Sequence, residues 1–164
     1  MKNIFYVVLA MLIFASCEKP KKMGFIDNGT VINDFQEKKD VEIQFQAKEE
    51  AFRKRADSIG QAFQVEVQST QVTAQKASQS KAQELMNGLQ QKQNQLQQQM
   101  QIEQQQLTQA FQTEVDSVIS KVKVFVKDYG KTNGYTYILG TSDAAATVMY
   151  GAEEEDLTQI ILDA

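Results

Sequence analysis

Histidine and cysteine, two side chains that often carry out chemistry in proteins, are nearly absent from this chain. Its 164 residues include no histidine and one cysteine, Cys17. Without histidine, the chain lacks the commonest general base of catalytic sites and the commonest ligand of metal sites. The carboxylates of Glu49-Glu50 and Glu153-Glu154-Glu155 are typical of solvated charge, and no glycine-rich phosphate loop occurs. We expect no catalytic residue, no metal site and no cofactor, and therefore no enzyme.

Cys17 itself points to covalent attachment of a lipid. It follows MKNIFYVVLAMLIFAS, in which Lys2 precedes an apolar run from Ile4 to Phe14. A run this short is typical of a signal peptide rather than a membrane span. Phe-Ala-Ser-Cys resembles a bacterial lipobox, where cleavage leaves the cysteine first and its thiol takes a diacylglycerol. The alternative, a cleaved signal with an incidental cysteine, leaves a free thiol in an exported protein, which is unusual.

A lipid at this position also determines the compartment. We expect residues 1–16 to be a signal peptide and residues 17–22 a lipid-anchored tether outside the cytoplasm, where ATP is not supplied. Glu18-Lys19-Pro20-Lys21-Lys22 is not the acidic run that sends lipoproteins to the outer face in some bacteria. The leader does not distinguish the two membranes. We expect a periplasmic protein anchored through Cys17, with the outer membrane as the expected anchor site.

The overall charge argues against a nucleic-acid partner. The formal net charge is −4 and the pI is about 4.9, whereas nucleic-acid binding requires a basic face. The basic run Arg53-Lys54-Arg55 has acidic neighbours at Glu49-Glu50 and Asp57, which indicates an exposed helix face with many ion pairs.

Most of the remaining chain carries apolar residues at helical spacing. The intervals are three, four or seven residues in two stripes: Val41, Phe45, Phe52, Ala56, Ile59, Phe63 and Val67, then Leu89, Leu96, Met100, Leu107 and Phe111. The second stripe passes through the glutamine-rich stretch 90–106, and glutamine is a fair helix former. A disordered tract would lack this period. The helical pattern from 31 to 129 is too long for one globular helix, so it is a continuous coiled coil or a hairpin.

Two hairpin registers fit the stripes. A tip at Gln79-Ser80 brings Phe52 opposite Leu107, Ile59 opposite Met100 and Phe63 opposite Leu96. A tip at Asn87-Gly88, the stronger local turn signal, instead pairs the same three residues with Val122, Val115 and Phe111. The apolar period alone does not choose between these registers.

The flanking segments favour the first register. Residues 23–26 and 135–139 have the composition and the closing turns of short strands. If both strands belong to one sheet, the two helical arms must have similar lengths, which places the tip near 78–80. Residues 147–150 are expected to form a third strand. A last helix over 157–162 is expected to follow, with Glu155 or Asp156 near its cap.

The predicted fold is therefore α+β, with a long antiparallel helical hairpin projecting from a small β-sheet head. Residues 31–129 form the arms, and residues 23–30 and 130–164 form the head. A head of this size buries too little surface to stand alone, so we expect an oligomer. Expected hairpin packing residues are Phe45, Phe52, Ile59, Phe63, Leu96, Met100, Leu107 and Val118. Expected head or oligomer core residues are Phe25, Ile26, Tyr137, Ile138, Leu139, Val148, Tyr150 and Leu157.

The order of these motifs resembles the Skp/OmpH family of periplasmic chaperones. The motifs are Gly24-Phe25-Ile26-Asp27 before the hairpin and, after it, Tyr135-Thr136-Tyr137-Ile138-Leu139, Val148-Met149-Tyr150 and Asp156-Leu157-Thr158. The resemblance covers essentially the whole mature chain. It implies a homotrimer whose three hairpin arms enclose a cavity. It also implies an ATP-independent holdase function toward unfolded outer-membrane β-barrel proteins.

This chain departs from that family in two ways. Family members often have strongly basic arms, whereas residues 37–92 carry nine basic and eight acidic residues here. A lipid on Cys17 would tether the protein to a membrane, unlike a freely diffusing chaperone. Two other functions stay open. A lipid-anchored coiled-coil spacer of the envelope predicts parallel, continuous helices and no sheet. An assembly adaptor would bind one specific partner through its head.

Overall fold

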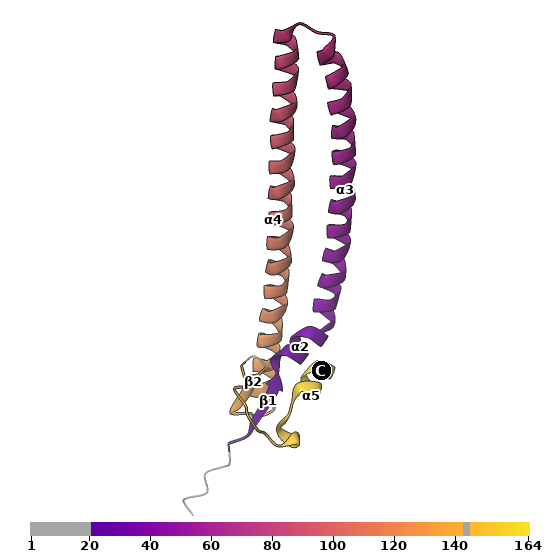
Figure 1. The fold of residues 1–164 in the computed structure, drawn as a ribbon. Helices are drawn as coiled ribbons and strands as arrows, with labels where there is room; N and C mark the ends of the chain where they lie inside the picture. The colour runs from indigo at the N-terminus through magenta and orange to yellow at the C-terminus, as the bar shows by residue number, and fades with distance from the viewer. Residues whose placement is uncertain (1–20, 143–144) are drawn as a thin grey trace, which may run out of the picture. The chain divides into compact units, whose positions relative to one another are not determined.

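The computed structural model describes residues 21–142 and 145–164. The expected signal peptide, Cys17 and most of the tether lie outside the described residues. In chain order the elements are β1 (Met23–Asp27), α2 (Asn28–Asp34), α3 (Gln36–Gln75), α4 (Gln79–Thr132), β2 (Tyr137–Thr141), the 3-10 turn η1 (Glu153–Glu155) and α5 (Thr158–Asp163) (Figure 1). The described residues divide into two units. We call residues 32–122 the arm unit and residues 21–31, 123–142 and 145–164 the head unit.

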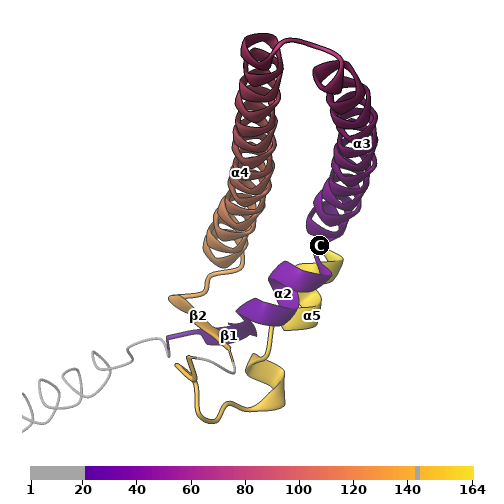
Figure 2. The same ribbon diagram turned by 45° about the horizontal axis from the view of Figure 1, so that its top comes forward.

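Two long helices run side by side through the arm unit (Figures 1 and 2). α3 has 40 residues and α4 has 54, which correspond to about 60 and 80 Å at 1.5 Å per residue. No proline follows Pro20, so no residue of either helix lacks the backbone N–H that a helix needs. Gly60 and Gly88 lie inside these helices, and nothing would touch a Cβ placed at either position.

The turn between the arms consists of Lys76, Ala77 and Ser78, slightly before the expected tip at 78–80. The N–H groups of Lys76 and Ala77 donate to Thr73 and Ala74, each at 3.2 Å, which tightens the end of α3. The carbonyl of Ser78 accepts the N–H of Ala82 at 2.9 Å. Serine is a favoured residue at a helix start, so Ser78 begins the second helix rather than occupying the middle of the turn.

The head unit contains a two-stranded parallel sheet. Met23 lies opposite Tyr137 and Asp27 lies opposite Thr141, so the strands before and after the hairpin do share one sheet. The other edge of β1 binds the C-terminal segment, because the Leu157 N–H donates to the Phe25 carbonyl at 2.8 Å. β1 is therefore the central strand of the head, between β2 and the segment that leads into α5.

A small apolar core closes this arrangement. Leu157 is 1% exposed and Val31 is 2% exposed, and Ile26 and Ile161 are also buried. A Cβ at Gly24 would lie 2.6 Å from the Leu157 Cδ1, so only glycine lets Leu157 reach its place over β1.

Short polar side chains form hydrogen bonds next to this core, at the starts of α2 and α5. The Asp27 carboxylate accepts the Thr30 N–H at 2.7 Å and so caps α2. The Asp27 N–H donates to the Thr158 hydroxyl at 2.9 Å. Asp156 accepts the Thr158 N–H at 2.9 Å at the start of α5, so an acidic residue does stand at this helix start.

The expected third strand over 147–150 is wrong for this chain. Thr147 and Met149 lie in bends, none of these residues belongs to a strand, and the backbone hydrogen bonds of the segment are local. The Thr147 N–H donates to the Ala145 carbonyl at 2.7 Å, and the Val148 N–H donates to the Thr141 hydroxyl at 3.5 Å. β-branched and aromatic residues favour a strand only where a neighbouring strand pairs with them, and no described segment of this chain does so here.

Candidate functional site

Three ion pairs join the two helices of the arm unit. They connect Glu66 with Lys92, Arg55 with Glu103, and Glu37 with Lys121. On α3, Arg55 lies eleven residues before Glu66. On α4, its partner Glu103 lies eleven residues after Lys92, the partner of Glu66. The helices are therefore antiparallel in one constant register. These exposed pairs contribute little energy individually, but each one specifies which residues face each other.

Apolar side chains fill the interface between the arms. Phe45 is 5% exposed and its ring meets that of Phe111 edge-on, with the centroids 5.3 Å apart. Val118 and Leu89 are also buried. The other expected packing residues are half-buried: Phe52, Ile59, Phe63, Leu96, Met100 and Leu107. A pair of helices without further cover leaves such side chains partly open to solvent on both sides.

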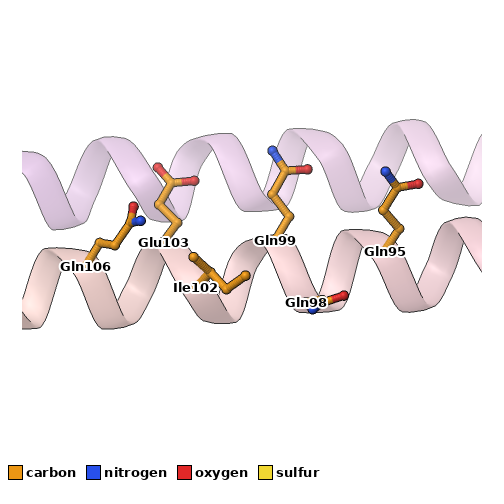
Figure 3. A pocket seen from close by; sticks show the side chains of 6 residues that line it. All are labelled: Gln95, Gln98, Gln99, Ile102, Glu103 and Gln106. Atoms are coloured by element: carbon orange, nitrogen blue, oxygen red, sulfur yellow. The ribbon is translucent and has the colours of Figure 1, made fainter.

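A shallow groove of about 550 Å³ opens between the arms beside this interface. It is lined by Lys48, Ala51, Phe52, Arg55, Glu103, Gln106 and Leu107. A second hollow of about 470 Å³ lies along α4 and is lined by Gln95, Gln98, Gln99, Ile102, Glu103 and Gln106. Figure 3 shows the side chains of Gln95, Gln99 and Glu103 pointing from α4 toward the other arm. The surface between the arms thus combines apolar side chains, such as Phe52 and Leu107, with amide groups that both donate and accept hydrogen bonds.

Apolar residues also lie on the opposite face of α3. Ile43, Val65 and Val72 are 64%, 66% and 53% exposed. At about 100° per residue they lie roughly half a turn from Phe52, on the side away from α4. We call these three residues the outer face. α4 adds exposed Met86 and Ile102. None of these five residues is needed for packing between the arms.

In the head unit, the expected core residues separate into two sets. Leu157 and Ile26 are buried, and Phe25, Ile138 and Val148 are half-buried. Tyr137, Leu139 and Tyr150 are exposed in the single chain, Tyr150 at 89%, and Met149 beside it is 88% exposed. A core role for this second set requires another copy of the chain, and it stays a prediction.

Among the described residues, four buried hydrophobic side chains were not among those expected: Val31, Leu89, Val122 and Ile161. Helical spacing indicated three of them. Leu89 begins the second apolar stripe, Val122 follows Val118 by four residues, and Ile161 follows Leu157 by four residues.

Within 21–142 and 145–164, no group of three or more acidic or cysteine side chains could hold a metal ion. None of the helices in this part of the chain is long and apolar enough to cross a membrane. Every buried side-chain nitrogen or oxygen described has a hydrogen-bond partner. The exposed arm and head surfaces described above are the candidate sites.

Comparisons with known proteins agree with this architecture. Residues 22–164 match the model of the family described as "Outer membrane protein (OmpH-like)". Among solved structures, the chain is similar to an OmpH-like protein from Caulobacter crescentus, provisionally named an outer membrane chaperone. The TM-score is 0.76 at 13% identity, over 89% of this chain and 84% of the other. No curated protein matches the chain significantly. The expected fold class is confirmed, and this chain belongs to the OmpH-like family.

Proposed function

We propose that this protein is an ATP-independent holdase chaperone. It binds unfolded outer-membrane proteins in a cavity that the helical arms of several copies form. The proposal rests on exposed apolar side chains that do not pack between the two arms, namely Ile43, Val65 and Val72 on α3. Family membership and the name given to the Caulobacter structure support the same function.

The chemistry of the arms suits weak and reversible contacts. Isolated valine and isoleucine side chains each bury little surface, so no single contact would hold a client tightly. Many such contacts on one client act together and raise the overall affinity. Glutamine side chains such as Gln95 and Gln99 can bond to an exposed backbone without selecting a sequence. None of these contacts requires nucleotide hydrolysis.

A homotrimer built through the head is part of this proposal. Within the described residues, β2 pairs only with β1, so its outer edge is open to another strand. Tyr137 and Leu139 on β2 are exposed, as are Met149 and Tyr150. An apolar strand edge of this kind is normally covered in a stable protein. Association of three heads would cover it and would bring three pairs of arms together.

Membrane attachment completes the proposal. Diacylglycerol on Cys17 would hold the head at a membrane, facing the periplasm, with the outer membrane as the proposed anchor site. Cys17 lies outside the described residues, so the support here is the leader sequence alone. A chaperone stationed in this way meets its clients where they insert.

A protection assay tests the holdase function. The chain from residue 17, carrying Cys17→Ser, is mixed with a urea-unfolded outer-membrane β-barrel protein during dilution, and light scattering is followed without ATP. We expect aggregation to be suppressed at about three chains per client, as the proposed trimer requires. A well-folded oligomer that leaves the scattering unchanged would refute the proposal.

Variants of the outer face test the surface that carries the proposal. Replacing Ile43, Val65 and Val72 together with glutamine should weaken protection severalfold and leave the helix content unchanged. The matched control replaces exposed Gln46, Gln64 and Gln71, which lie near the same positions, with asparagine. Equal protection by both triple variants would show that the outer face does not bind clients.

The envelope-spacer alternative does not fit the structure. It predicted parallel, continuous helices and no sheet, whereas α3 and α4 are antiparallel and joined by a turn at Lys76–Ser78. The sheet of β1 and β2 is likewise unexplained by a spacer.

A further inference from the structure

Charged residues of the head unit are separated by sign. Apart from Asp128, its described acidic residues lie on β1 or in the C-terminal segment: Asp27, Glu153, Glu154, Glu155, Asp156 and Asp163. Its basic residues lie in the incoming chain or on the last turns of α4: Lys21, Lys22, Lys123, Lys127 and Lys131. The acidic run meets the edge of β1 away from β2, because Asp156 bridges to Phe25. α4 contacts the other strand, since Gly130 lies against Ile138.

The three α4 lysines lie along one face of the helix. Lys123, Lys127 and Lys131 recur every four residues, which turns each one only about 40° from the one before. All three are exposed, and none forms an ion pair with any described carboxylate. By contrast, Lys121 on the same helix is paired with Glu37. The three lysines therefore form no salt bridge within the described residues.

Lys22, from the incoming chain, lies at the C-terminal end of the same helix. Its ammonium donates to the Asn133 carbonyl at 3.1 Å and lies 3.9 Å from the centre of the Tyr135 ring. Its carbonyl accepts the Thr136 N–H at 2.7 Å. These contacts fix the N-terminal segment at the C-terminal end of α4. Four residues separate Lys22 from Cys17, so the five steps from one Cα atom to the other can span at most about 18 Å.

We infer that Lys123, Lys127 and Lys131, together with Lys21 and Lys22, bind the anionic phospholipid headgroups of a membrane surface. We call these five residues the lysine patch. Unpaired lysines beside a membrane anchor are attracted to anionic lipid within about a Debye length. A single acyl anchor holds a protein only marginally, and a basic patch supplies the second attachment. The inference rests on the proposed membrane anchor and specifies that the C-terminal end of α4 lies toward the lipid.

Vesicle flotation with the non-lipidated protein tests the patch. The chain from residue 17 with Cys17→Ser is mixed with phosphatidylcholine vesicles, with or without added phosphatidylglycerol, at low and at physiological salt. We expect binding only to the anionic vesicles, and weaker binding as salt rises. Changing Lys123, Lys127 and Lys131 together to glutamine should lower the partition coefficient by at least about tenfold.

A control variant with the same change of net charge separates local from general attraction. It replaces Lys54, Lys76 and Lys81, which are exposed in the arm unit, with glutamine. The control should float like the parent chain. Equal loss of binding by the two variants, or equal binding to neutral vesicles, would overturn the inference.

The protection assay distinguishes this result from failure of the proposed function. The α4 lysine variant should suppress aggregation as well as the parent does, because its substitutions lie outside the outer face. Loss of protection with unchanged flotation would overturn the inference and assign these lysines to clients. Since the protein used here lacks the acyl chain, the outcome does not depend on whether Cys17 is lipidated.

Discussion

Removing the Phe45 ring should weaken the arm unit more than any change on its outer face. Phe45 is 5% exposed and packs edge-on against Phe111 at 5.3 Å. Truncating a buried phenylalanine to alanine costs about 3–5 kcal/mol, part of which is the cavity left behind. The helix pair is open to solvent on both sides and can partly close the gap. We therefore expect about 3 kcal/mol for Phe45→Ala.

Urea unfolding followed by circular dichroism measures this loss. With a denaturant slope of about 1–3 kcal/mol per molar urea, the midpoint should fall by about 1–3 M. Phe45→Leu keeps most of the volume and should cost less than about 1.5 kcal/mol. Val65→Ala, at a side chain 66% exposed, serves as the control and should change stability by no more than about 0.5 kcal/mol. Equal midpoints for Phe45→Ala and Val65→Ala would refute the reasoning, because burial at the arm interface would then carry no special weight.

Three further perturbations follow from the same structure. Gly60→Ala and Gly88→Ala should each raise the free energy of unfolding by about 0.5–1 kcal/mol in the same urea titration, because both glycines are inside helices with open space around them. A loss of stability in either variant would show a contact that the structure lacks. Arg55→Glu should cost about 1 kcal/mol or less by placing two carboxylates together, and adding Glu103→Arg should restore most of it in a double-mutant cycle. A cycle without coupling would mean that this pair does not help to set the register. Leu157→Ala should cost about 2–5 kcal/mol, since this side chain is 1% exposed over β1, and the near-UV signals of the tyrosines of the head unit should change with it. Retained stability would show that the head core lies elsewhere.

The local pattern was sufficient to predict the long helices and the two paired strands of this protein. Apolar residues at intervals of three, four and seven predicted the arm helices, and the structure has helices over Gln36–Gln75 and Gln79–Thr132. Short apolar runs closed by glycine turns predicted strands near 23–26 and 135–139, where β1 and β2 lie. Helix and strand periods depend on residues a few positions apart, so a single sequence carries them.

Pairing between distant segments needed more than periodicity. The apolar stripes fitted two registers, because a shift by whole heptads returns apolar residues to apolar partners. The positions of oppositely charged residues distinguish the two registers. Glu66 faces Lys92 and Arg55 faces Glu103 in the observed register, whereas a tip at Asn87-Gly88 would set both α3 residues against uncharged partners.

The third strand shows why strand composition alone is insufficient. Thr147–Tyr150 has the residues of a strand but bonds only locally, since a strand exists only where another segment offers its backbone. The clustering of Lys22 with the end of α4 likewise depends on contacts between residues more than a hundred positions apart. Sequence by itself determined where the long helices lie and which segments can form strands, because those preferences are local. Tertiary structure decided the register, the sheet order and the lysine patch, because each depends on which distant backbone and charge a residue meets.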